Sequence, residues 1–138
     1  MNQRIYQRGV EIVSALKVKT KNGKSHHGAL IYKKGKILSI GVNNYLKRHN
    51  SNRFGEFTDH KGYTTEYKAC RHAEISAIIR YGEEDLSDCE MLVVRIDNKN
   101  KPSLSRCCVN CARVLNGLNI KKVFYSDENG EFQRDERF

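Results

Sequence analysis

Apolar residues along this chain recur with two periods, one typical of helices and one typical of strands. From Ile5 to about Lys17 they are spaced three or four positions apart with polar residues between them, which predicts an amphipathic helix. Two largely apolar runs follow at 28–32 and 36–43, separated by a short turn at 33–35 that contains a glycine. This arrangement predicts a β-hairpin after the first helix.

The second half of the chain alternates between strand and helix patterns. Its predicted elements are a helix from just ahead of His72 to about Tyr81, a strand at 89–96, a helix from Cys108 to near Gly117 and a strand at 121–125. Gly82 is placed to end the first of these helices. The run at 89–96 is almost continuously apolar, which is typical of a central strand covered on both faces. Phe132 either begins a short fifth strand or packs the tail.

The order β-α-β-α-β predicts an α/β fold in which two helices lie side by side on one face of the sheet, because crossover connections are right-handed. At 138 residues the chain has the length of one domain, spanning residues 1–138. Its apolar runs are far shorter than the roughly 18 residues that a membrane span requires, and the first residues do not form a signal peptide. We therefore expect a soluble protein.

Residues 44–67 show no sustained periodicity and predict a loop of unusual length. Loops this long in a compact domain are usually functional or disordered. This one carries Lys47, Arg48 and Arg53 among aromatic residues, a mixture that suits an anionic, aromatic ligand through charge and stacking. These three cations are therefore candidates for binding phosphate. An irregular surface loop that is pinned by its aromatic residues is the alternative.

The net charge also favours an anionic partner. Lys and Arg number 25 against 16 Asp and Glu, which gives a formal charge of +9. Such a surplus suits a nucleotide or a nucleic acid. The basic residues are spread along the chain, however, and solvated faces and turns explain many of them equally well. Charge alone therefore does not choose between a small nucleotide and a polymer.

Five cysteines form an odd and locally clustered set, which suits metal binding in a reducing compartment such as the cytoplasm better than a disulfide framework. Cys108 and Cys111 lie three apart at the start of a predicted helix, where free backbone N–H groups and the helix dipole favour thiolates. His72 stands at the start of another helix. One imidazole and two thiolates suit Zn²⁺ and leave one tetrahedral position open for water. The sequence therefore predicts a zinc site.

A carboxylate accompanies this predicted site. Glu74 is two residues after His72, so on a helix their side chains point about 200° apart and Glu74 is not expected to ligate the same ion. It can instead border the cavity above the zinc and carry a proton from an activated water to a substrate, as hydrolysis of an amino-substituted pyrimidine or purine requires. An exposed first-turn glutamate that only favours the helix dipole is the alternative.

Three segments carry a resemblance to a known family. His72-Ala73-Glu74, followed by Cys108-Val109-Asn110-Cys111, resembles the H-x-E and P-C-x-x-C signature of the zinc-dependent cytidine/deoxycytidylate deaminase superfamily. Gly41-Val42-Asn43 resembles the turn that ends the family's opening hairpin. The likeness covers most of residues 28–126. In style the chain is similar to small phage-type deoxycytidylate deaminase-like proteins.

This resemblance implies a cytidine deaminase-like three-layer α/β/α fold with a mixed sheet of about five strands. It implies hydrolysis by a zinc-activated water with release of ammonia. The site residues that it implies are the zinc ligands His72, Cys108 and Cys111, the proton carrier Glu74, and the substrate contacts Asn43 and the main-chain N–H of Ala73. Family members commonly assemble, so a homo-oligomer is expected.

The chain departs from the family pattern at two positions. Cys107 stands where the family usually has proline. It could replace Cys108 as a ligand, or it could complete a closed structural site that has no room for water. Ser76 stands where deoxycytidylate deaminases tend to carry asparagine, so the resemblance leaves the substrate open.

The remaining metal-binding residue types have weaker assignments. Cys70, His49 and His60 either form an auxiliary metal site, as some deoxycytidylate deaminases possess, or have no such role. Cys89 is expected to pack as a small apolar residue.

Three functions are consistent with these observations. The first is hydrolytic deamination of a cytosine nucleotide, with deoxycytidylate (dCMP) preferred, to the uracil nucleotide. The second is deamination of a base in single-stranded DNA or in RNA, where the surplus of positive charge would follow the backbone. The third is a zinc-stapled binding module without catalysis.

Overall fold

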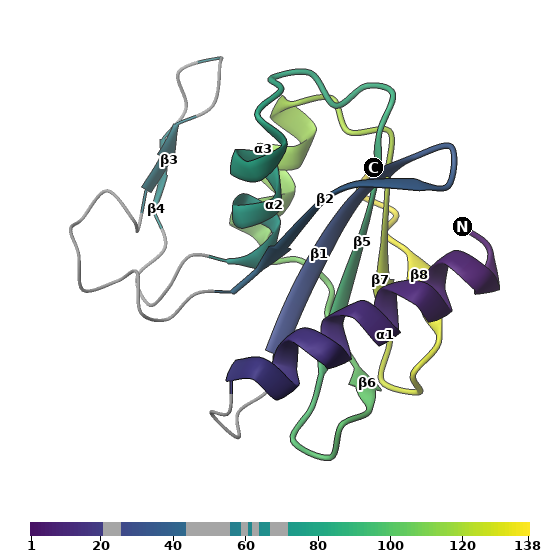
Figure 1. The fold of residues 1–138 in the computed structure, drawn as a ribbon. Helices are drawn as coiled ribbons and strands as arrows, with labels where there is room; N and C mark the ends of the chain where they lie inside the picture. Colours follow the sequence, from purple (N-terminus) through teal and green to yellow (C-terminus); the bar gives the residue numbers. More distant parts are fainter. Residues whose placement is uncertain (21–25, 44–55, 59–60, 62–63, 67–71) are drawn as a thin grey trace.

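The computed structural model describes residues 1–20, 26–43, 56–58, 61, 64–66 and 72–138 (Figure 1). The helices in this part of the chain are α1 (Gln3–Thr20), α2 (Ala73–Tyr81) and α3 (Val109–Gly117). The strands are β1 (His26–Lys33), β2 (Lys36–Val42), β3 (Glu56–Thr58), β4 (Thr64–Glu66), β5 (Glu90–Ile96), β6 (Pro102–Ser103), β7 (Lys122–Ser126) and β8 (Phe132–Arg134). No helix among these residues is both long and apolar enough to cross a membrane.

The main sheet is mixed and has the strand order β2-β1-β5-β7-β8, with β6 paired to β5 outside this path. Strands β5 and β7 are parallel, whereas β1 pairs antiparallel with both β2 and β5, and β8 pairs antiparallel with β7. The run at 89–96 forms the central strand, as its apolar composition predicted. Helix α1 lies on one face of the sheet and helices α2 and α3 on the other (Figure 1). The predicted three-layer α/β/α fold is therefore confirmed.

The sheet has a hydrophobic core on each side, because successive residues of a strand point to opposite faces. In β1, Ala29 and Ile31 belong to the core shared with α2 and α3, whereas Leu30 and Tyr32 belong to the core beneath α1. Residues 91–94 of β5 alternate between the two cores in the same way. Helices α2 and α3, at whose N-terminal ends the predicted zinc ligands lie, are consequently on the same face of the sheet.

Helix α1 shows that one of the basic residues has a structural role. Lys17 is buried, and its ammonium group donates to the carbonyl oxygen of Asp97 and, at 3.1 Å, to Oδ1 of Asn100. A buried ammonium group requires such acceptors. The end of the helix is thereby attached to the turn between β5 and β6.

Some elements differ from the sequence prediction. The stretch 44–67 was predicted as a loop, but it contains the antiparallel pair β3–β4, in which Phe57 lies opposite Thr65. The two-residue strand β6 was also not predicted. Elements this short carry too little periodicity to be recognised. Phe132 begins β8, which resolves the two alternatives for the tail.

Gly41 sets the distance between β2 and α2. A Cβ atom at this position would lie 2.1 Å from the Ala77 nitrogen and 2.4 Å from the Ala73 oxygen. Both are backbone atoms, so the helix itself would have to move. We expect Gly41→Ala to lower the free energy of unfolding by about 3 kcal/mol, the upper range for overpacking, as measured by urea denaturation.

Gly82 offers a matched control for Gly41→Ala. It ends α2 at a φ of 79°, and nothing lies within 4 Å of a Cβ built there. Gly82→Ala should therefore cost only the strain of a left-handed backbone, about 1 kcal/mol. Equal losses in the two variants would contradict the close approach of β2 and α2.

Candidate metal and catalytic site

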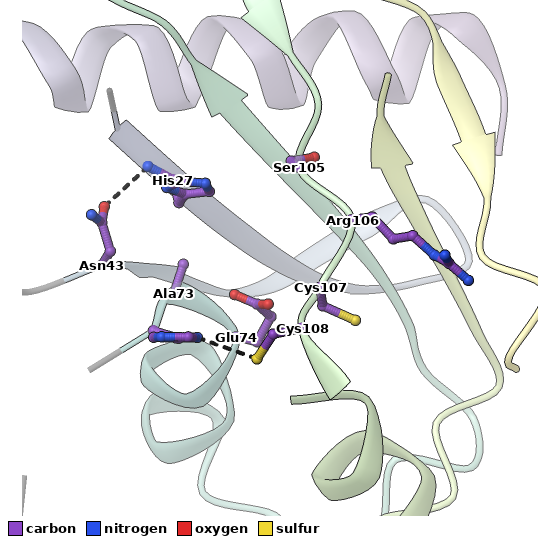
Figure 2. Close-up of a pocket in the computed structure, with 9 residues that line it drawn as sticks. His27, Asn43, Ala73, Glu74, Ser105, Arg106, Cys107 and Cys108 are labelled. Carbon is purple, nitrogen blue, oxygen red and sulfur yellow. Dashed lines mark hydrogen bonds between the residues drawn. The ribbon is translucent and has the colours of Figure 1, made fainter. Parts of the chain in front are cut away.

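A small cavity of about 210 Å³ opens where the N-terminal ends of α2 and α3 approach the hairpin β1–β2 (Figure 2). Its lining residues are His27, Asn43, His72, Ala73, Glu74, Ser105, Arg106, Cys107 and Cys108. They come from the start of β1, the residue after β2, the start of α2 and the loop that leads to α3. Imidazole, carboxyl, amide and thiol groups therefore converge on one cavity, which is typical of a site for a polar ligand.

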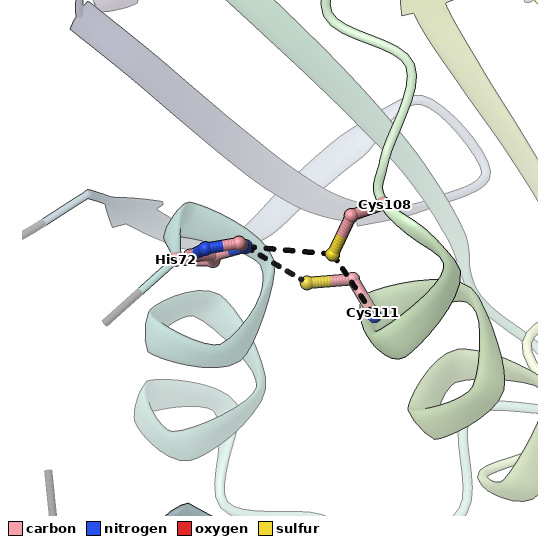
Figure 3. Close-up of side chains that lie close together, drawn as sticks. All are labelled: His72, Cys108 and Cys111. Carbon is pink, nitrogen blue, oxygen red and sulfur yellow. Dashed lines mark hydrogen bonds between the residues drawn. The ribbon is translucent and has the colours of Figure 1, made fainter. Parts of the chain in front are cut away.

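Three soft donor atoms gather at one side of this cavity (Figure 3). Nδ1 of His72 lies 3.6 Å from the Cys108 sulfur and 3.5 Å from the Cys111 sulfur. All ligand atoms of the three residues lie within 4.8 Å of one another. Helices α2 and α3 thus bring together residues 36 and 39 positions apart, as their order along the chain predicted.

Two of these donors lie just ahead of their helices. His72 and Cys108 are the N-cap residues of α2 and α3, with extended backbones at φ −67°, ψ 153° and φ −67°, ψ 167°. The helix predicted to begin just ahead of His72 therefore begins one residue after it. The Cys108 sulfur accepts the main-chain N–H of Cys111 at 3.4 Å. In this way the sulfur caps α3 as the oxygen of a serine caps other helices.

The surroundings of Cys108 favour its thiolate form. The Cys111 thiol hydrogen-bonds to the Cys108 sulfur, and together with His72 and the helix N–H it lowers the pKa of Cys108 to about 4. In turn, the hydrogen bond to Cys108 raises the pKa of His72. Thiolate is the form of cysteine that binds metal. One imidazole and two sulfurs therefore fit Zn²⁺ by their chemistry.

Glu74 is buried against this group. Its exposed fraction is 5%, and Figure 2 shows its carboxyl group beside Cys108 at the cavity. Burial raises the pKa of Glu74, although its neighbours His72 and Cys111 act in the opposite direction. The alternative of an exposed first-turn glutamate is therefore wrong. A buried carboxyl group with a raised pKa is suited to holding and releasing a proton.

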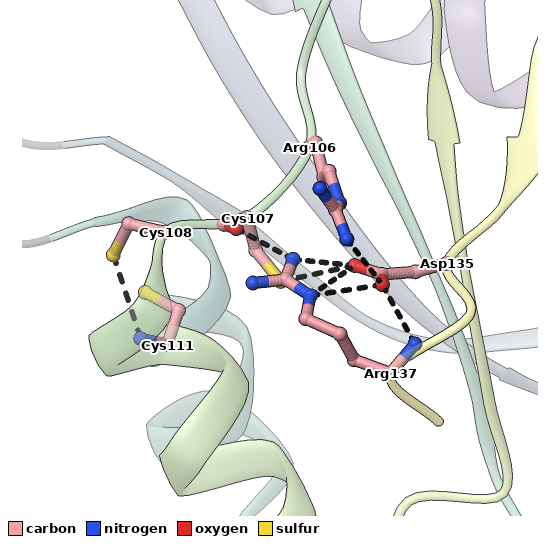
Figure 4. Close-up of polar contacts among 6 residues, drawn as sticks. All are labelled: Arg106, Cys107, Cys108, Cys111, Asp135 and Arg137. Atoms are coloured by element: carbon pink, nitrogen blue, oxygen red, sulfur yellow. Dashed lines mark hydrogen bonds and ion pairs between the residues drawn. The ribbon is translucent and has the colours of Figure 1, made fainter.

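The Cys107 side chain points toward Arg137 and away from the sulfurs of Cys108 and Cys111 (Figure 4). Its sulfur lies 3.3 Å from Nη2 of Arg137 and 3.8 Å from Oδ2 of Asp135. Burial raises the pKa of the Cys107 thiol to about 12, so the thiol stays neutral. Neither a swapped ligand nor a closed site with three sulfurs fits this geometry.

Asn43 and Ala73 lie where a ligand in the cavity would meet them. Asn43 is bound to His27 through two hydrogen bonds, with its main-chain N–H donating to the His27 carbonyl oxygen at 3.2 Å and its Oδ1 accepting the His27 N–H at 3.0 Å. This pairing ties the end of β2 to the start of β1. Ala73 is the first residue of α2, so its N–H lies at the positive end of the helix dipole.

Three of the lining residues were not predicted from the sequence: His27, Ser105 and Arg106. Desolvation, aided by the positive charge of Arg95, lowers the pKa of His27 to about 4. The imidazole is therefore neutral at neutral pH and offers one donor and one acceptor. These residues belong to no motif, and only the pairing of β1 with β2 and β5 brings His27 to the cavity.

Several predicted site residues lie outside the described residues. They are Lys47, Arg48 and Arg53, proposed for phosphate, and His49, His60 and Cys70, considered for an auxiliary metal site. Cys89 is buried in the core shared with α2 and α3, as predicted, with its sulfur 3.7 Å from the Tyr81 hydroxyl.

The fold and the donor set together define an α/β/α protein with a zinc-type site between two helices. Residues 3–127 match the family described as the cytidine and deoxycytidylate deaminase zinc-binding region. The chain belongs to this family of zinc-binding deaminases. A comparison with curated protein sequences gives no match.

Solved structures of deaminases share the fold. The dCMP deaminase of cyanophage S-TIM5, in complex with dCMP and dUMP, is 21% identical with a TM-score of 0.57, over 93% of this chain and 85% of that one. Guanine deaminase from Bacillus subtilis is 23% identical with a TM-score of 0.58, over 93% and 66%. Cytidine deaminase from Burkholderia pseudomallei is 16% identical with a TM-score of 0.56, over 99% and 94%. At these identities the likeness establishes the fold.

Proposed function

We propose that this protein is a zinc-dependent hydrolytic deaminase that converts a cytosine nucleotide, dCMP by preference, to the uracil nucleotide with release of ammonia. The observation that carries this proposal is the buried carboxyl group of Glu74, which shares a cavity with His72 and Cys108 of the His/Cys/Cys donor set. The similar cyanophage protein was crystallised with dCMP and dUMP, which supports the choice of a pyrimidine nucleotide.

His72, Cys108 and Cys111 would hold the zinc ion. When bound, zinc would act as a Lewis acid that makes water reactive as a nucleophile near neutral pH. Three protein ligands, rather than four, are typical of catalytic zinc sites, because one position must stay available. The position of the Cys107 sulfur against Arg137 supports this set of three and argues against a purely structural zinc module.

Glu74 would carry the protons of the reaction. Its carboxylate takes a proton from the attacking water and delivers it to the neighbouring ring nitrogen, and a second transfer gives the amino group the proton with which it leaves as ammonia. Of the two protons of the water, one ends on the ring nitrogen and the other in the ammonia, so that H₂O and N=C–NH₂ become HN–C=O and NH₃. The raised pKa of Glu74 favours both the acceptance of a proton and its brief retention.

The cavity would hold the base. Its volume of about 210 Å³ is below the roughly 300 Å³ at which pockets begin to enclose drug-sized ligands. A single base fits this size better than a whole nucleotide does. The Ala73 N–H would bind the base carbonyl, and the Asn43 amide would bind the base or sugar, with the neutral His27 beside it. Lys47, Arg48 and Arg53 remain the proposed contacts of the phosphate.

A comparison of substrates tests this proposal. The zinc-loaded protein is incubated with dCMP, dCTP, deoxycytidine and a cytosine-containing single-stranded oligonucleotide while loss of cytosine absorbance is followed. We expect kcat/KM for dCMP to exceed that for deoxycytidine by about 10- to 100-fold, because hydrogen bonds to a charged group contribute about 1.5–3 kcal/mol. If only the oligonucleotide reacts, the substrate is a base in a nucleic acid and not a free nucleotide.

A further inference from the structure

The end of the chain reaches back to the loop that precedes α3. Asp135 directly follows β8, and its main-chain N–H donates to the Val123 carbonyl oxygen of β7 at 2.8 Å. The Asp135 side chain is completely buried, and Figure 4 shows it between Arg106 and Arg137. Asp135 and Arg137 lie beyond residues 3–127, the region that matches the family. They are therefore a feature of this chain in addition to the family motif.

Asp135 holds the Arg137 guanidinium in one orientation. Its Oδ1 accepts the main-chain N–H of Arg137 at 3.1 Å and Nε at 2.9 Å, and its Oδ2 lies 2.5 Å from Nη2. Arg106 approaches the same carboxylate at 3.7 Å. A buried carboxylate requires such partners, because an unpaired charge in the interior is very unfavourable. Paired contacts of this kind also fix the plane of the guanidinium group.

The fixed guanidinium in turn holds Cys107. Nη2 of Arg137 donates to the Cys107 carbonyl oxygen at 2.7 Å and to its sulfur at 3.3 Å. That carbonyl group shares one planar peptide unit with the nitrogen and Cα of Cys108. Fixing the oxygen therefore orients the plane from which Cys108 continues. Only the rotations about the N–Cα and Cα–Cβ bonds of Cys108 then determine where its sulfur lies.

The other end of this short loop is also fixed. The hydroxyl of Ser105 donates to the Val93 carbonyl oxygen of β5 at 2.6 Å, and its main-chain N–H donates to the Ser126 carbonyl oxygen at 2.9 Å. Residues 105–107 are thus attached to the sheet at one end and to Arg137 at the other. The segment that presents Cys108 has no regular secondary structure of its own, so these attachments determine its path.

We propose that Asp135 and Arg137 are positioning residues of the metal site, which hold the Cys107–Cys108 peptide so that the Cys108 sulfur faces His72 and Cys111. The proposal rests on the assignment of Cys108 as a zinc ligand in the proposed function. Groups that orient metal ligands commonly change metal affinity by about 10- to 100-fold when they are removed.

The rate of zinc release measures this positioning directly. A colorimetric chelator is added to the zinc-loaded full chain, and the rate of zinc transfer is compared between the wild type, Arg137→Ala and Arg137→Lys. We expect release to be at least about 10-fold faster in Arg137→Ala. The release rate of Arg137→Lys should be intermediate, because an ammonium group keeps the charge but lacks the planar set of N–H donors that joins Asp135 to Cys107. Arg134→Ala removes an arginine whose hydrogen bond goes to the Phe138 carbonyl oxygen, and it should release zinc at the wild-type rate.

Cobalt(II) in place of zinc gives a readout that is independent of activity. The thiolate-to-cobalt absorption should shift or weaken in Arg137→Ala and stay unchanged in Arg134→Ala. Wild-type release rates and wild-type cobalt spectra in both Arg137 variants would overturn the proposal, even if their melting temperatures fall. If the tail only stabilised the fold, losing its contacts would lower the melting temperature and change neither the release rate nor the spectrum. If Arg137→Ala does not fold, the same measurements on Arg137→Lys decide. Full zinc retention in Cys108→Ala would instead refute the ligand assignment of the proposed function.

Discussion

Glu74→Gln will bind zinc as the wild type does and lose nearly all turnover. Glutamine has almost the shape of glutamate, but its amide cannot take a proton from water and pass it to the base. General acid–base catalysis typically contributes about 10²–10⁴-fold. Because Glu74 would act in two successive transfers, we expect kcat to fall about 10⁴-fold, which corresponds to about 5.5 kcal/mol in the activation barrier. The measurement is the rate of cytosine loss from dCMP, with zinc content determined on the same sample.

The same substitution should stabilise the metal-free protein. Burial raises the pKa of Glu74, so the folded state binds the proton more tightly than the unfolded chain does. Above the ordinary carboxyl pKa, the buried charge therefore lowers the free energy of unfolding. Glutamine carries no charge and removes this penalty. Urea denaturation of the two proteins should show a gain at neutral pH that shrinks as the pH falls toward 4.5, the ordinary pKa of the group.

Glu84→Gln is the matched control for both measurements. Glu84 is exposed beyond the end of α2, so its loss should leave the rate, the zinc content and the stability unchanged. Wild-type turnover in Glu74→Gln would remove Glu74 from the mechanism. Loss of zinc in this variant would show instead that the carboxyl group supports the metal rather than the proton transfer.

The metal site could be predicted from the sequence because each pattern that indicates it lies within a short stretch of the chain. The spacing of Cys108 and Cys111 places both at the start of one helix, and His72 stands at the start of another. Apolar periodicity predicted the individual helices and strands, and their β-α-β-α-β order then predicted that the two helices share a face of the sheet, which brings the donors together. Each step uses only neighbouring residues and the rule of right-handed crossovers.

The rest of the site depends on contacts between distant segments, which periodicity does not report. His27 reaches the cavity because β1 pairs with β2 and β5, and this register cannot be deduced from the residues of β1 alone. Asp135 and Arg137 resemble an exposed charged tail in the sequence, yet Asp135 is buried beneath Arg137. Charged residues are buried only when partners are available. Asp135 has Arg137 two positions away, but its other partner, Arg106, and the Cys107 carbonyl group that Arg137 binds are about 30 positions away. The role of Cys107 was left open for the same reason.

Cys111→Ala will abolish zinc binding and, with it, all measurable turnover. Cys111 is fully buried and supplies one of the three donors that gather among the described residues. Its loss leaves a histidine and a single thiolate, too few for a catalytic zinc site. Zinc at about 1,000 times its Kd stabilises a folded protein by about 4 kcal/mol. The wild type should show a gain of this order in its free energy of unfolding when zinc is added, and Cys111→Ala should show none. Elemental analysis after dialysis should likewise find one zinc per chain only in the wild type.

Two other cysteine variants separate loss of a ligand from loss of packing. Cys89→Ala removes a sulfur from the same hydrophobic core, where Cys89 is 2% exposed, and should retain both zinc and activity. Cys107→Ser tests the remaining thiol beside the site. Because the Cys107 sulfur lies against Arg137 and its pKa is raised to about 12, zinc should stay bound at one equivalent. Loss of zinc from Cys107→Ser together with retention of zinc in Cys108→Ser would instead make Cys107 the ligand. In that case the zinc-loaded protein would have a different arrangement, without the Cys108 sulfur turned toward His72.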